Sequence, residues 1–310
     1  MIDDEYSISF SSLIPMSINS KMTAENPFLQ FQARSLILWC FLISLGLGLT
    51  FDLIAGFNGF NPQDPVFTPI IYILTFNLLS FWAIQRLCQL PFNFKRLIGD
   101  LPNRFPWLPT IGIVIAILLF SLGSGQLFFY ALSFSHPSFV ESLLQEKTWL
   151  SSSETFAPLL HNILTIIAVL FVAPVTEELL FRGILLHRWT VKWGVTPALL
   201  ISSLLFGILH TNVIGLFVFG LMMALLYIKT RTLIVPIACH FLNNLTAVGL
   251  EFVSQGSGTT ETANILEQLR SDWWVGVVYM VLSAPWLITF IYKNWPKQPL
   301  SVPYFTNSSQ

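Results

Sequence analysis

Long apolar runs separated by short polar stretches dominate the chain. A helix that crosses the hydrocarbon core of a bilayer needs about 20 mostly apolar residues. Eight candidate runs cover residues 35–56, 66–85, 110–133, 158–187, 197–210, 212–228, 232–250 and 273–292. The pattern therefore predicts an all-α protein, a polytopic bundle of about eight transmembrane helices. The connection between the fifth and sixth runs is the shortest.

The distribution of these runs divides the chain into four parts. Residues 1–33 and 293–310 are polar and are expected to form mobile tails. Residues 34–155 hold the first three expected helices and their loops. The other five expected helices, over residues 156–292, form a C-terminal bundle.

Composition supports a membrane protein and excludes a soluble one. Hydrophobic residues make up 54% of the chain and charged residues only 10%, and the mean hydropathy is +0.68. Soluble domains carry about 25% charged residues. The net charge of −1 lacks the basic excess of nucleic-acid binding. The lipid bilayer is therefore the expected surrounding. The three cysteines, Cys40, Cys88 and Cys239, form no CxxC pair and are expected to pack in apolar surroundings.

Basic residues fall almost entirely on one side of the expected bundle. With the N-terminus in the cytoplasm, 13 of the 15 Lys and Arg residues lie on the inner side, and Lys147 and Arg270 on the outer side. Cytoplasmic loops of membrane proteins are enriched in these residues. We therefore expect a multi-pass membrane protein with both termini in the cytoplasm.

Two adjacent carboxylates, Glu177 and Glu178, lie within an expected span. Ionisable groups inside a membrane cost about 2.5–3.5 kcal/mol each even on lenient scales, and usually mark function. Glu178 and Arg182 share a helical face, whereas Glu177 is turned about 100° away. The spacing predicts a structural Glu178–Arg182 pair and an available Glu177; an interfacial pair at a helix end is the alternative. Pro174 is expected to open or kink this helix because it lacks an N–H.

Polar side chains recur on two further expected helices. His210 ends the 197–210 run, one turn after Phe206, and His240 and Asn244 lie four residues apart in the 232–250 run. At about 1.5 Å per residue from the cytoplasmic helix ends, Glu177, His210 and His240 lie about 15, 20 and 12 Å deep. These positions predict one buried cluster that faces the cytoplasm. Histidines that pack in the core, or hydrogen bonds that join helices, are the alternative.

At these residues the sequence resembles the CAAX prenyl endopeptidase and bacteriocin-processing (CPBP, also called Abi) intramembrane proteases. Their signature places the motifs EExxxR, FxxxH and HxxxN/D on successive transmembrane helices. The corresponding residues here are Glu177, Glu178 and Arg182, then Phe206 and His210, then His240 and Asn244. The resemblance covers roughly residues 158–250, and nothing in residues 1–155 is recognised.

The resemblance implies hydrolysis of peptide bonds within the membrane. Glu177, with His210, is expected to take a proton from the attacking water. His240 and Asn244 are expected to donate hydrogen bonds to the oxyanion. The remaining motif residues, Glu178, Arg182 and Phe206, are expected to support the site structurally.

A metal mechanism is the alternative to this one. Glu177, His210 and His240 are of the ligand types that a catalytic zinc takes, with a fourth position left for water. The HExxH motif is absent, and no other obvious base remains if all three residues bind zinc. We therefore favour a glutamate base without an obligatory metal, and zinc dependence remains open.

Two other classes of function fit a buried cluster of acids and histidines. It could form a proton relay or substrate site of a transporter, or it could persist in a catalytically idle scaffold or immunity-type protein. No inverted repeat of a transporter is evident, and every motif side chain of the protease is present. The expected partner is a membrane-associated peptide or protein, and prenylated C-termini are among the candidates.

Overall fold

The computed structural model describes residues 26–145, 150, 155–256, 265–297 and 302–307, and every regular element among them is a helix. Seven long or apolar helices are α3 (Ala33–Phe57), α4 (Phe67–Cys88), α6 (Trp107–Ser135), α11 (Val195–Ile208), α12 (Val213–Thr230), α13 (Ile234–Gly256) and α15 (Trp273–Asn294). The expected N-terminal tail up to residue 25, residue 147, and residues 298–301 and 308–310 of the expected C-terminal tail lie outside the described residues.

One continuous helix over residues 158–193 alternates between α and π geometry. Its parts are α8 (Pro158–Ile167), the π-helix η2 (Ala168–Val172), α9 (Ala173–Glu178), the π-helix η3 (Leu179–Leu185) and α10 (Leu186–Trp193). It ends at Gly194, whose φ of 87° suits a residue without a Cβ. Short helices are α2 (Pro27–Gln30), α5 (Phe94–Ile98), α7 (Pro137–Gln145), α14 (Ile265–Ser271) and α16 (Pro303–Thr306).

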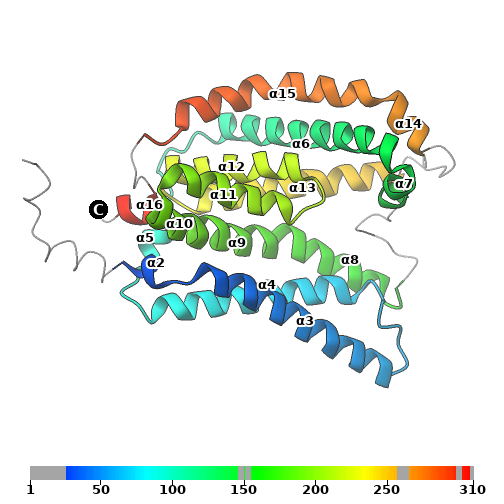
Figure 1. Cartoon of the computed structure of the whole chain (residues 1–310), viewed down its shortest axis with the longest axis horizontal. Coiled ribbons are helices and arrows are strands. Elements are labelled where there is room, and N and C mark those ends of the chain that lie inside the picture. The colour runs from blue at the N-terminus through cyan, green and yellow to red at the C-terminus, as the bar shows by residue number, and fades with distance from the viewer. Residues whose placement is uncertain (1–25, 146–149, 151–154, 257–264, 298–301, 308–310) are drawn as a thin grey trace, which may run out of the picture.

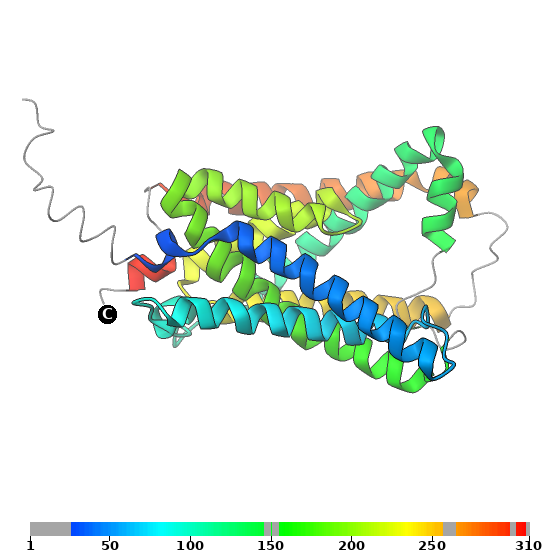
Figure 2. The ribbon, with the colours of Figure 1, turned by 60° about the horizontal axis from the view of Figure 1, so that its bottom comes forward.

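The long helices stack in layers. Figure 1 shows α15 beside α6, then α12, α11 and α13, then the α8–α10 helix, and finally α4 and α3. In the turned view of Figure 2, α3 runs diagonally across the front of the bundle and converges on α4 toward the loop that joins them. The α8–α10 helix therefore lies inside, where α4 contacts it from one side and α13 from the other.

The expected count of eight spans is corrected to six. Among the described residues, six helices are long and apolar enough to cross a membrane: α3, α4, α6, the α8–α10 helix, α12 and α15. The expected span 197–210 corresponds to α11, which has only 14 residues and rises about 21 Å, less than the roughly 30 Å hydrocarbon core. The expected span 232–250 corresponds to α13, which carries the polar site residues His240 and Asn244 and is not among the six.

Burial follows this arrangement. The central helix α12 buries a continuous stretch from Phe219 to Tyr227, whereas α3 exposes large apolar side chains such as Phe41 and Leu53. Exposed apolar side chains suit lipid contact rather than water. The all-α polytopic bundle expected from the sequence is thus confirmed.

Two glycines allow α6 and α15 to approach closely. A Cβ on Gly123 would lie 2.6 Å from the carbonyl oxygen of Gly276, and a Cβ on Gly276 would lie 3.0 Å from the carbonyl oxygen of Gly123. Small residues at a helix crossing let two backbones approach in this way.

The described parts of both polar tails are packed, in contrast to the expectation of mobile tails. Phe28 of α2 is fully buried and stacks on His187, with ring centroids 4.9 Å apart. The backbone N–H of Tyr304, in α16, donates to Nε2 of His187 over 3.1 Å. The aromatic residues Phe28 and Tyr304 therefore anchor the two otherwise polar tails to His187 of α10.

Candidate active site

The two adjacent glutamates lie at the end of α9, between two π-helices. In η2 the N–H of Ala173 donates to the carbonyl of Ala168, five residues earlier. The next bond of this ladder would run from residue 174 to Val169, but Pro174 has no N–H. The Nδ2 amide group of Asn244 donates to this carbonyl instead, over 2.8 Å. Pro174 therefore opens the helix, and Asn244 from α13 satisfies the freed oxygen.

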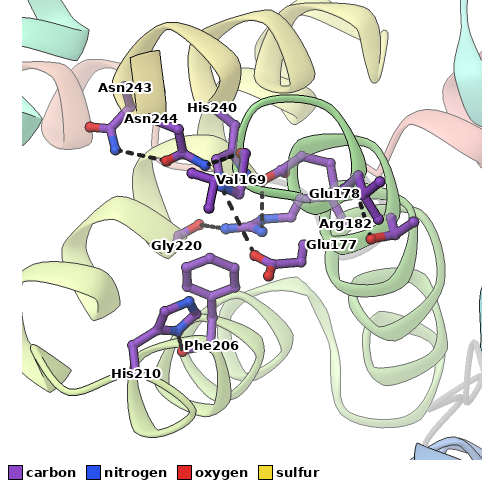
Figure 3. Close-up of polar contacts among 12 residues, drawn as sticks. Val169, Glu177, Glu178, Arg182, Phe206, His210, Gly220, His240, Asn243 and Asn244 are labelled. Atoms are coloured by element: carbon purple, nitrogen blue, oxygen red, sulfur yellow. Dashed lines mark hydrogen bonds and ion pairs between the residues drawn. The ribbon is translucent and has the colours of Figure 1, made fainter. Parts of the chain in front are cut away.

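Glu178 is fully buried and, together with Arg182, joins three helices. Its Oε1 accepts a hydrogen bond from Arg182 over 3.0 Å and a second one from Nδ1 of His240 over 2.9 Å. Arg182 also donates to the carbonyl of Gly220 on α12 over 3.1 Å. The expected Glu178–Arg182 pair is present (Figure 3), and Glu178 in addition orients the imidazole of His240.

Glu177 is also buried, with 6% of its surface exposed. Its Oε1 accepts a hydrogen bond from the hydroxyl of Tyr72 on α4 over 2.7 Å. Its Oε2 is buried and has no hydrogen-bond partner among the described residues. Nε2 of His240 lies 4.0 Å from this oxygen. Because a carboxylate only accepts, Nδ1 of His240 carries the hydrogen and Nε2 of the neutral ring is an acceptor.

Phe206 contacts both candidate histidines. Its ring centroid lies 4.7 Å from that of His210 and 6.2 Å from that of His240. The guanidinium carbon of Arg182 lies 4.6 Å from the same centroid. His210 follows the end of α11, and its Nδ1 donates to the carbonyl of Phe206 over 2.7 Å. The spacing of the FxxxH motif therefore lets the phenylalanine fix the histidine.

The tertiary structure brings the predicted residues together to different degrees. His240 is hydrogen-bonded to Glu178 and lies 4.0 Å from Glu177, as Figure 3 shows. Between the described side chains no hydrogen bond or ion pair joins His210 to Glu177, and Asn244 is bonded to the η2 backbone. Tyr72 was missed, because one tyrosine in an apolar span carries no signal of its own.

The three residues named as possible zinc ligands do not form a metal site in this geometry. Within the part of the chain that is described, no group of three or more His, Cys, Asp or Glu residues could hold a metal ion. Two ligands of a tetrahedral zinc lie about 3.4 Å apart, less than the 4.0 Å between His240 and Glu177. A water molecule that bonds both atoms at about 2.8 Å fits this gap.

Comparison with known proteins gives a family and two relatives. Residues 159–246 match the type II CAAX prenyl endopeptidase Rce1-like family. An uncharacterized 24.3 kDa protein of Escherichia coli is 27% identical over 237 residues, which cover 73% of this chain and 97% of that protein. The Bacillus subtilis (strain 168) protein named "Putative membrane peptidase YdiL" is 36% identical over 88 residues, which cover 27% of this chain and 36% of that protein. No solved structure matches the chain.

The matched segment contains all three motifs, from Glu177 to Asn244, and none of the first three expected helices. In the part of the chain that the structure describes, six helices are long and apolar enough to cross a membrane. The chain is therefore an integral membrane protein, and its resemblance to the CAAX prenyl endopeptidase family is confirmed over residues 159–246.

Proposed function

We propose that this protein is an intramembrane endopeptidase in which Glu177 activates the attacking water. One observation carries the proposal: Oε2 of Glu177 is buried without a hydrogen-bond partner among the described residues and faces Nε2 of His240 across 4.0 Å. A buried polar atom without a partner costs about 1–3 kcal/mol. The gap suits one water molecule, held by a base on one side and an imidazole on the other.

The reaction begins at this water. Glu177 removes a proton as the water oxygen attacks the scissile carbonyl, and the resulting acid returns the proton to the leaving amine. His240 accepts from the water while its ring is neutral. It can donate to the oxyanion only when Nε2 is also protonated, and the carboxylate of Glu178 faces the imidazolium that would form. No step passes through a metal ion.

Two further motif residues have roles near this centre. Asn244 uses one N–H for the carbonyl of Val169, which leaves its second N–H for the oxyanion. Nδ1 of His210 is held by the carbonyl of Phe206, so Nε2 is the nitrogen available to the substrate or to water. The proposed role of His210 is to hold the attacking water or the leaving group, rather than to contact Glu177 directly.

The proposed substrate is a peptide or protein segment at the membrane. The site lies on helices that pack inside an apolar bundle, so a soluble protein could reach it only with an extended or lipid-anchored segment. The family resemblance makes prenylated C-termini the first class to test.

The test is cleavage of a peptide library, prenylated and unprenylated, by the purified protein in detergent. We expect the wild type to cleave a subset and Glu177→Gln to lose about 10²- to 10⁴-fold in rate. Glutamine keeps the size of the side chain and can still accept from Tyr72, so the variant is expected to fold. Glu267→Gln, on the exposed face of α14, is the matched control. Full activity of Glu177→Gln would exclude Glu177 as the base.

A further inference from the structure

We infer that Tyr72 is a positioning residue for Glu177, an inference that rests on the proposed function. The hydroxyl of Tyr72 donates to Oε1 of Glu177 over 2.7 Å, between residues 105 positions apart in the sequence. A phenol is a donor to an ionised carboxylate, which has no hydrogen to give back. The bond therefore fixes one oxygen of the base and leaves the other one for the reaction.

The two oxygens of Glu177 are made different by their surroundings. Oε1 is occupied by Tyr72, whereas Oε2 is buried, lacks a hydrogen-bond partner among the described residues and lies 4.0 Å from Nε2 of His240. Without the tyrosine, the carboxylate could rotate about its last side-chain bond and exchange the two oxygens. With it, Oε2 stays directed at the position of the proposed water.

The neighbouring cation does not provide this restraint. The guanidinium of Arg182 donates hydrogen bonds to Glu178 and to the carbonyl of Gly220. Glu178 also accepts a hydrogen bond from Nδ1 of His240. Across the described part of the chain, Tyr72 is the side chain whose hydrogen bond holds Glu177. The two glutamates are thus fixed by different partners: Glu177 by Tyr72, and Glu178 by Arg182 and His240.

Tyr72 has a rigid support of its own. It lies on α4, which packs against η2 and α9, the segments that surround Pro174 and the two glutamates. Its ring lies 4.5 Å from the ring of Phe76, one helical turn further along α4. Both residues lie outside residues 159–246, where the chain matches the endopeptidase family. The N-terminal helices therefore complete the site rather than only anchor it.

A side chain that orients a base stabilises the transition state more than the bound substrate. Loss of the hydroxyl is therefore expected to lower kcat and to leave KM almost unchanged. Hydrogen bonds to charged groups are strong enough for an effect of about 10- to 100-fold. A residue with only a structural role would instead reduce the amount of folded protein and leave the kcat of the folded fraction unchanged.

The experiment compares Tyr72→Phe with the wild type on the library peptide that the wild type cleaves fastest. We expect kcat per folded protein to fall about 10- to 100-fold and KM to stay within about twofold. The thermal unfolding midpoint in detergent should fall only by the cost of one buried hydrogen bond, because Oε1 of Glu177 loses its donor. In a Glu177→Gln background the same substitution should have no further effect on the residual rate, because the base that it positions is gone. Tyr292→Phe, at a position on α15 that is 84% exposed, is the matched control.

The outcomes separate the two proposals. If the wild type cleaves and depends on Glu177 but Tyr72→Phe keeps full kcat, the positioning role is wrong and the endopeptidase stands. Equal losses from Tyr72→Phe with and without Glu177 would also overturn the role, since they would show an effect independent of the base. Absence of cleavage by the wild type would overturn the proposed function and this role together.

Discussion

At the scale of single residues, Pro174 explains why an asparagine on another helix is needed. A proline leaves the carbonyl of Val169 without its backbone donor, and Asn244 supplies the replacement. The same asparagine belongs to the HxxxN motif with His240, so one residue joins the opened helix to the helix that carries the imidazole. The side chain expected only at the oxyanion therefore also holds the backbone in place.

This pairing predicts a dependence between two substitutions. Asn244→Ala should destabilise the protein by about 1–2 kcal/mol, because it leaves a carbonyl without a partner. In a Pro174→Ala background the restored N–H can bond Val169, so most of this cost should disappear. Unfolding in detergent of the wild type, both single variants and the double variant would measure the coupling. An equal cost of Asn244→Ala in the two backgrounds would contradict this account.

At the scale of helices, two features shape the bundle: interruptions of the α-helical hydrogen-bond pattern and close helix crossings. The π-helices η2 and η3 enclose α9 and its two glutamates, and π segments often occur at functional sites. Away from the site, Gly123 and Gly276 bring α6 and α15 into backbone contact. The π-helices therefore shape the candidate site, whereas the glycine contact holds α15 against α6 in the outer layer of the bundle.

The crossing of α6 and α15 gives a prediction with a control on the same helix. Gly123→Ala places a Cβ 2.6 Å from a backbone oxygen that cannot rotate away. We expect a loss of about 1–3 kcal/mol in stability, measured by thermal unfolding in detergent. Gly112→Ala, also on α6, meets nothing within 4 Å and should be neutral or stabilising by up to about 1 kcal/mol. Similar stability of the two variants would disprove the close crossing.

At the scale of the whole molecule, the basic helices gather at one end. Figure 1 places α5, α10 and α16 at one end of the bundle and α7 and α14 at the other. The first end carries Lys95, Arg96, Arg188 and Lys192, whereas α14 carries Arg270. By the distribution of basic residues in membrane proteins, the first end is predicted to be cytoplasmic, together with both termini.

Labelling of single cysteines checks this orientation. In a variant that lacks Cys40, Cys88 and Cys239, the thiol of Lys192→Cys on α10 should react with an impermeant reagent only from the cytoplasmic side. The thiol of Ser138→Cys, which is exposed on α7, should react only from outside. Labelling of both thiols from the same side would reject the predicted topology.

Periodicity and composition determined the class of fold and the positions of most helices, because the hydrocarbon core selects long apolar helices. They predicted too many membrane spans. The helix α11 is too short for a crossing helix, and α13 is too polar. Motif spacing determined the Glu178–Arg182 pair, because residues four apart meet on one helix. Only the tertiary structure decided the contacts between helices: Tyr72 to Glu177, His240 to Glu178 and Asn244 to Val169. These contacts join residues far apart in the sequence, where local spacing carries no information about distance.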